Sequence, residues 1–235
     1  MKDLLPANIR FQPASDQSLL IYFGDTISLP THQKIVKFLK LLESSPVPGV
    51  LNVQPAYTSV QLKFDALRFT HAEIESAVRE PLAQLDDLAL PAPRQKEIPV
   101  CYGRDFGPDL QEVASLHGIS AEEVIHLHSS ATYTVYFLGF VPGFAYLGGL
   151  PDKLATPRLP TPRKQVPVGS VAIGGNQTGV YPTETPGGWR LIGRTPLKLF
   201  DASTAHASFF EIGDEVRFVP ASADKFARLE AKWRR

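Results

Sequence analysis

The chain has 235 residues, 43% of them hydrophobic and 20% charged, which is enough for two small domains or one large one. Lysine plus arginine numbers 24 and so does aspartate plus glutamate, which excludes the broad positive field of proteins that bind nucleic acid or anionic lipid. Cys101 is the only cysteine, so an intrachain disulfide is excluded and a cytoplasmic location is expected.

Two segments bear on export and membranes. Residues 1–11 lack the long apolar core of a signal peptide, so we expect no export. The uncharged window 129–151 is long enough to span a bilayer, but it contains four glycines and two prolines. A helix exposed to lipid cannot accommodate that composition, and no membrane association is predicted.

The first 90 residues alternate between strand and helix patterns. Strands are expected over residues 8–12, 18–24, 49–57 and 58–65, and helices over 31–45 and 70–85. Thr31 is expected to cap the first helix, whereas Thr70 and Glu73 form a capping box at the second, which Pro81 should kink. Residues 1–90 therefore predict a small N-terminal α/β domain.

The pattern changes after an acidic pair and three prolines within residues 86–99, and we place a linker at residues 91–100. The second domain, residues 101–235, should begin with two short helices over 109–118 and 120–128. Strand-like runs then follow, separated by glycine and proline, at residues 132–140, 169–175, 178–182, 189–196 and 215–220. They predict a β-barrel or sandwich, and the fold class of the whole chain is α+β.

The two short helices invite comparison with a helix-turn-helix. A recognition helix presents Arg, Lys, Asn or Gln to the bases, but the second helix offers Glu122, Glu123, His126 and His128. His126 and His128 also point about 200° apart on a helix, so they cannot bind one metal ion together with His117. Neither nucleic acid nor a metal is expected on this chain.

Common cofactor motifs are also missing. The sequence contains no G-x-x-x-x-G-K-[ST] loop and no strand followed by G-x-G-x-x-G, so any ATP is not bound here by those devices. Met1 is the only methionine, which excludes the usual Met-Lys-Met site of biotin attachment.

Residues 139–195 carry the strongest functional signal. Pro142 and Gly143 predict a rigid turn, because proline fixes φ and glycine permits positive φ, and Phe140 and Phe144 flank it. Between Ser129 and Asp201 there are seven Lys or Arg residues against three acidic ones. This local excess of positive charge favours an anionic ligand or partner.

At these residues the sequence resembles the carboxyltransferase-domain subdomain C/D family, also called allophanate hydrolase subunit 1. The resemblance is carried by residues 128–151, 157–175, 177–196 and 199–201, and it extends in layout over nearly the whole chain. It implies an N-terminal α/β domain followed by a cyclophilin-like β-barrel. The family includes the B-type subunit of ATP-dependent 5-oxoprolinases, an inhibitor of a bacillar sporulation kinase, and part of the carboxyltransferase region of urea carboxylases.

The resemblance implies that the chain hydrolyses 5-oxo-L-proline to L-glutamate within a complex of three kinds of subunit. Its partners would be a companion of the carboxyltransferase type and a third subunit. ATP would be bound outside this chain. Inhibition of a sensor histidine kinase is an alternative from another class. A role in a urea-type carboxylase or allophanate hydrolase is a further alternative, and it needs a biotin-bearing partner.

The resemblance also suggests roles for residues that match the family's motifs. His128 would move a proton, and Arg158 and Arg163 would bind a carboxylate or a phosphorylated intermediate. The expected substrate-binding residues are Tyr136, Phe140, Phe144, Arg158, Arg163, Gln177 and Tyr181.

Overall fold

The computed structural model describes residues 8–204 and 206–233, which divide into two compact units that meet in the sequence between Ala92 and Pro93. The expectation concerning a signal peptide rests on residues 1–11, of which 1–7 lie outside the described part. Each unit has its own buried core and is considered by itself.

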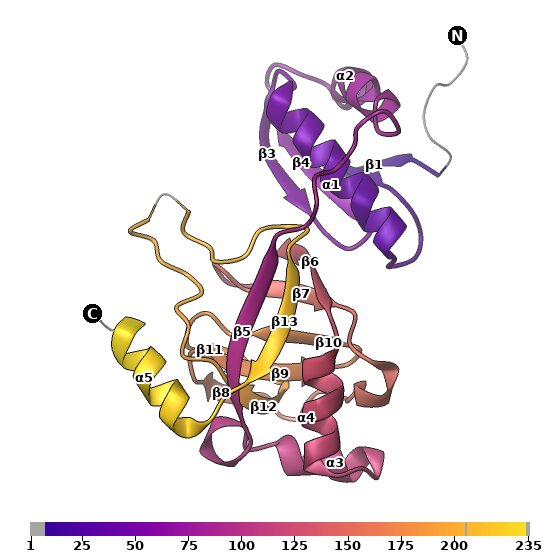
Figure 1. The fold of residues 1–235 in the computed structure, drawn as a ribbon. Helices are drawn as coiled ribbons and strands as arrows, with labels where there is room; N and C mark the ends of the chain where they lie inside the picture. Colours follow the sequence, from indigo (N-terminus) through magenta and orange to yellow (C-terminus); the bar gives the residue numbers. More distant parts are fainter. Residues whose placement is uncertain (1–7, 205, 234–235) are drawn as a thin grey trace. The chain divides into compact units, whose positions relative to one another are not determined.

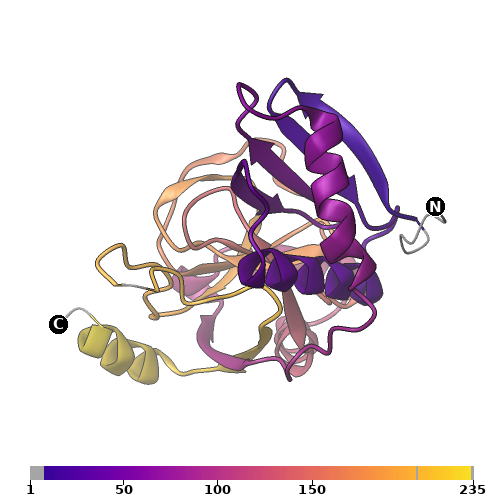
Figure 2. The same ribbon diagram turned by 90° about the horizontal axis from the view of Figure 1, so that it is seen from above.

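The first unit is an antiparallel sheet of four strands in the order β1-β2-β4-β3, with two helices (Figure 1). Its elements are β1 (Arg10–Ser15), β2 (Ser18–Tyr22), α1 (Leu29–Ser44), β3 (Val50–Pro55), β4 (Ser59–Phe64) and α2 (His71–Ala83). Helices α1 and α2 cross one another in the view of Figure 2 and bury their apolar faces in one cluster with the sheet. The predicted α/β character of this region is confirmed.

The helix ends of the first unit test the capping expectations. Thr70 and Glu73 form both hydrogen bonds of a capping box, as predicted. The prediction that Thr31 caps α1 is wrong, because the helix begins at Leu29 and the hydroxyl of Ser28 accepts the bond from the backbone N–H of Thr31. Ser28 has the extended backbone of an N-cap, and Pro30 then fits the first turn of the helix.

The second unit is a closed barrel of seven strands in the order β10-β7-β6-β13-β5-β12-β9, which confirms the barrel prediction. The barrel strands are β5 (Gln95–Tyr102), β6 (Tyr133–Leu138), β7 (Ala145–Gly148), β9 (Ser170–Gly174), β10 (Gln177–Val180), β12 (Arg190–Arg194) and β13 (Glu215–Pro220). Outside the barrel, β8 (Arg163–Val166) pairs with β11 (Thr185–Gly187). Three helices accompany these strands: α3 (Leu110–His117), α4 (Ala121–Ser130) and α5 (Ala223–Trp233).

The interval 91–100, predicted to be a linker, is mostly strand. Strand β5 pairs in parallel with β13 and antiparallel with β12, so it lies inside the barrel wall. Ile98 and Val100 alternate along it and are fully buried in the barrel core. Pro91, Pro93 and Pro99 obscured this alternation in the sequence. Strands β7, β8 and β11 and helix α5 also escaped prediction.

Candidate functional site

Strands β9, β10 and β12 have side chains on both faces of the barrel wall, and the two faces form separate clusters. Successive side chains of a strand point to opposite faces. Val171, Ile173, Val180 and Ile192 belong to the core inside the barrel. A second buried cluster, here called the outer cluster, lies on the other face and comprises Phe144, Val166, Ala172, Tyr181, Trp189 and Leu191.

Trp189 is the centre of the outer cluster, and two glycines make room for its ring. A Cβ on Gly174 would lie 2.6 Å from three ring atoms of Trp189, and one on Gly179 would lie 3.2 Å from Cζ3. The edge of Phe144 packs against Trp189 and against Tyr181, with ring centroids 5.6 and 5.5 Å apart. The glycines of this segment thus allow a large aromatic ring to lie flat on the sheet.

The turn between β6 and β7 carries the two phenylalanines of the aromatic loop in different environments. Phe144 is 2% exposed in the outer cluster, whereas Phe140 is 60% exposed and its ring packs edge-on against Phe144. Gly143 has φ of +81°, and a Cβ there would lie 2.7 Å from the Cβ of Phe200. The turn is therefore closed against residues 199–201, which belong to another segment of the family's motif.

The two predicted anion-binding arginines also differ. Arg158 is exposed, and its Cζ lies 5.8 Å from the ring centroid of Trp189. Arg163 opens β8, and its Nη2 donates to Oδ1 of Asp109 at 2.6 Å. Asp109 is buried, and its Oδ2 accepts a second bond from the backbone N–H of Leu191 at 2.7 Å.

Tyr181 lies close to both arginines. Burial raises the pKa of its phenol, while a backbone hydrogen bond from Trp189 and the positive charges of Arg158 and Arg163 lower it. The structure therefore brings Phe144, Arg158, Arg163 and Tyr181 together on the outer face. Gln177 shares this face, because it alternates along β10 with Gly179 and Tyr181.

His128 lies on the other side of β10. It is fully buried, its Nε2 is 2.9 Å from Oγ1 of Thr178, and its Nδ1 is 2.8 Å from the hydroxyl of Tyr102. The Thr178 hydroxyl donates to the carbonyl of Ala172, so it accepts from Nε2–H, and Nδ1 then accepts from Tyr102. Burial lowers the pKa of His128 to about 3, which keeps the ring neutral. This geometry supports a structural role.

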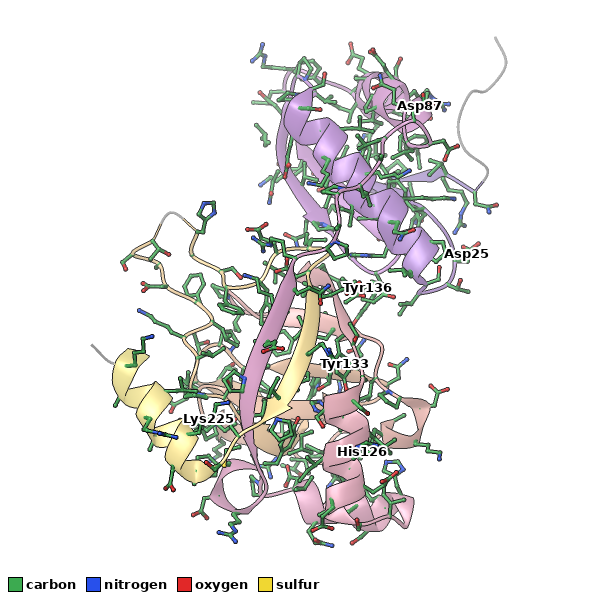
Figure 3. All side chains as sticks on the ribbon, viewed as in Figure 1. Asp25, Asp87, His126, Tyr133, Tyr136 and Lys225 are labelled. Carbon is green, nitrogen blue, oxygen red and sulfur yellow. The ribbon has the colours of Figure 1, made fainter. Side chains whose placement is uncertain are left out.

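Tyr136 is the extra residue of a bulge in β6, between the pairs Val135–Leu147 and Phe137–Tyr146. Its ring fills the space beside Gly148, where an added Cβ would lie 1.9 Å from the ring. The structure does not place Tyr136 in the outer cluster. Figure 3 shows Tyr136 and Tyr133 on β6, and His126 on α4.

Sequence reasoning missed the acidic residues of the site. Asp109 was seen only as the beginning of a short helical pattern, and Glu112 as one of its exposed positions. In the structure Glu112 forms an ion pair with Arg190, whose Nε donates to the carbonyl of Pro157 at 3.2 Å. An acidic pair at positions i and i+3, at the start of a helix, was the available signal.

Two searches of residues 8–204 and 206–233 concern metals and membranes. No group of three or more His, Cys, Asp or Glu side chains is placed to hold a metal ion. No helix within these residues has the length and apolar character needed to cross a bilayer.

Comparison with known proteins agrees with the resemblance seen in the sequence. Residues 9–210 match the sequence profile of the carboxyltransferase domain, subdomain C and D. The chain belongs to this family. The match includes every residue of the outer cluster and the paired Asp109 and Arg163.

Relatives within the carboxyltransferase C and D family are close in sequence. The chain is 58% identical over 212 residues to the B-type subunit of 5-oxoprolinase from Escherichia coli O157:H7, covering 87% of this chain and 93% of that protein. It is 40% identical over 226 residues to the B-type subunit of 5-oxoprolinase from Bacillus subtilis, covering 91% of this chain and 94% of that protein.

A solved structure of the family shows the same fold in a longer chain. The crystal structure of TTHA0988 is matched with a TM-score of 0.78 at 36% identity over 88% of this chain. The match spans only 40% of the TTHA0988 chain. The fold of this chain therefore also occurs as one part of a larger polypeptide.

We expect Gly174→Ala to move the Trp189 ring, because the new methyl group would overlap it. Both tryptophans of the chain, Trp189 and Trp233, follow Pro93, so tryptophan fluorescence reports on the second unit. The emission maximum should shift to longer wavelength as the ring gains water contact. Gly139→Ala is the control, since its Cβ would meet only ordinary contacts at 3.6 Å or more. Unchanged emission in Gly174→Ala would contradict the packing.

We expect His128 to make the barrel less stable in acid. Its folded pKa of about 3 lies below the ordinary 6.5, so the unfolded chain binds the proton first and stability falls as pH drops from 6.5 toward 3. The loss at pH 5 is about 2 kcal/mol. Urea unfolding, followed by tryptophan fluorescence at pH 7.5 and 5, should show a smaller loss in His128→Gln. Exposed His126→Gln is the control and should behave as wild type; equal losses in all three proteins would refute this role.

Proposed function

We propose that this chain is the B-type subunit of a 5-oxoprolinase, the enzyme that opens the lactam of 5-oxo-L-proline to give L-glutamate. The observation that carries the proposal is the similarity, over nearly the full length of both partners, to two proteins of that name. The outer face of the barrel fits this role chemically, because 5-oxoproline has a flat ring and one carboxylate. Aromatic side chains suit the ring, and guanidinium groups suit the carboxylate.

We propose that Phe144, Arg158, Arg163, Gln177 and Tyr181 contact the substrate, since all lie on the outer face. Phe140 lies at the exposed edge of this group. His128 and Tyr136 instead shape the barrel wall, and we no longer favour His128 for proton transfer. Its two nitrogens are already paired within the core, so it could reach a substrate only after the core opened.

We propose that ATP is bound outside this chain, because the sequence has none of the common phosphate-binding loops. ATP supplies the activation of the lactam oxygen, which makes a stable amide susceptible to water. The two partners expected alongside this chain are a companion of the carboxyltransferase type and a third subunit. The extra length of TTHA0988 fits such an arrangement, because there the same fold is joined to further polypeptide.

Inhibition of a histidine kinase stays a second candidate, favoured by one observation. Phe140 is a large apolar side chain, 60% exposed on a turn that is closed against Phe200. Exposed aromatics on rigid turns are common anchors of protein interfaces. Phe144 is not suited to that role, because it is buried in the outer cluster.

The test is 5-oxoproline-dependent hydrolysis of ATP by the chain combined with its two partner subunits. We expect turnover that requires all three proteins, and a fall in kcat/KM of at least about 100-fold in Arg158→Ala, corresponding to one lost charged hydrogen-bonding group. Lys153→Ala, in the exposed Asp152–Leu154 turn, is the matched control and should retain wild-type activity. Absence of 5-oxoproline-dependent hydrolysis from the complete complex would rule the proposal out.

The kinase alternative has its own readout. Under it, the chain would capture a histidine kinase and lose that capture in Phe140→Ser. An active complex with no kinase captured would eliminate the alternative.

A further inference from the structure

Three arginines surround the segment that carries Trp189, and two of them are neutralised. Arg163 is paired with Asp109, and Arg190 is paired with Glu112. Arg158 has no ion pair among the residues that the structure describes. The three guanidinium groups and two carboxylates therefore leave a single uncompensated positive charge, carried by Arg158 over the face of Trp189.

Both carboxylates come from the start of α3, and this helix also holds the segment that bears Arg158. Arg190, held by Glu112, donates to the carbonyl of Pro157, the residue before Arg158. His117 at the end of α3 lies within hydrogen-bond distance of the hydroxyl of Thr156, with Nε2 and Oγ1 2.9 Å apart. Residues 156–163 are thus fixed to one helix at both ends.

One donor of the arginine pair is left without a partner. Arg163 Nη1 is buried and has no hydrogen bond to any described residue, whereas Nη2 is held by Asp109. A buried guanidinium N–H without an acceptor is unfavourable, so its presence needs an explanation. Arg163 is close enough to Tyr181 to lower the pKa of its hydroxyl, and so is Arg158. Donors from three side chains therefore lie around one place.

We propose that Arg158, Nη1 of Arg163 and the hydroxyl of Tyr181 bind one singly charged carboxylate, and that Asp109 is the positioning residue that makes this site prefer a monoanion over a dianion. This deepens the proposed function and rests on it only for the identity of the substrate. It decides between the two ligands that the sequence left open, a carboxylate and a phosphorylated intermediate, in favour of the carboxylate.

The physical reason for the preference is the position of Asp109. Its carboxylate lies 2.6 Å from Arg163 and repels any anion that approaches the same guanidinium. That repulsion is twice as large for a dianion as for a monoanion. The buried bond to Leu191 holds the carboxylate in place, so it cannot swing away when a ligand arrives.

The experiment uses the full chain with Trp233→Phe, so that Trp189 is the only tryptophan and its fluorescence reports ligand binding. The probes are 5-oxoproline, the neutral lactam 2-pyrrolidinone, and sulfate as a dianion. We expect saturable binding of 5-oxoproline, at least tenfold weaker binding of sulfate, and none of 2-pyrrolidinone. Calorimetry on the same samples provides a second readout.

The deciding variant is Asp109→Asn, which keeps an oxygen to accept from Leu191 but removes the charge. We expect the preference for 5-oxoproline over sulfate to shrink at least tenfold, because the dianion gains more from the lost repulsion. Glu123→Gln on α4 removes a carboxylate that the structure does not place near the site, and its preference should match wild type. If Asp109→Asn does not fold, Glu112→Gln, at an exposed position, should shift the preference in the same direction.

Three results would overturn the inference. They are an unchanged preference in the folded Asp109→Asn or Glu112→Gln chain, wild-type binding of sulfate equal to that of 5-oxoproline, or binding of neither anion. Failure of the proposed function is distinguishable. In that case the complete complex would not hydrolyse ATP in response to 5-oxoproline, while acetate would still bind the chain and respond to Asp109→Asn.

Discussion

The alternation of side chains along β10 is the constraint that separates the two faces of the barrel wall. Thr178 and Val180 face the barrel interior, where Thr178 accepts a hydrogen bond from His128. Tyr181 faces outward, into the cluster around Trp189. A strand cannot present neighbouring residues to the same face. The barrel wall therefore divides a dry interior, where the histidine is neutral, from an outer face that carries the arginines.

The outer face owes its organisation to helix α3 as much as to the barrel. Buried charges are tolerated only when they are paired, and Asp109 and Glu112 supply the partners of Arg163 and Arg190. Each pair also ties a loop to a strand, so charge compensation and loop positioning come from the same contacts. Arg158 is left uncompensated as a result, at the place where an anionic ligand is proposed to bind.

Much of this was predictable from the sequence, because it follows from local rules. The capping box at Thr70, the turn at Gly143 and the barrel strands all rest on residues within a few positions of one another. The pairing of Asp109 with Arg163 joins residues 54 positions apart, and no local pattern announces it. Which of Phe140 and Phe144 is buried depends in the same way on Trp189, a distant residue.

A crystal structure of the full chain with 5-oxoproline tests the central claim most directly. We predict the ligand on the outer face of β10, with its carboxylate at Arg158 and Tyr181 and with the bonds of His128 to Tyr102 and Thr178 intact. A ligand bound inside the barrel against His128 would contradict the claim.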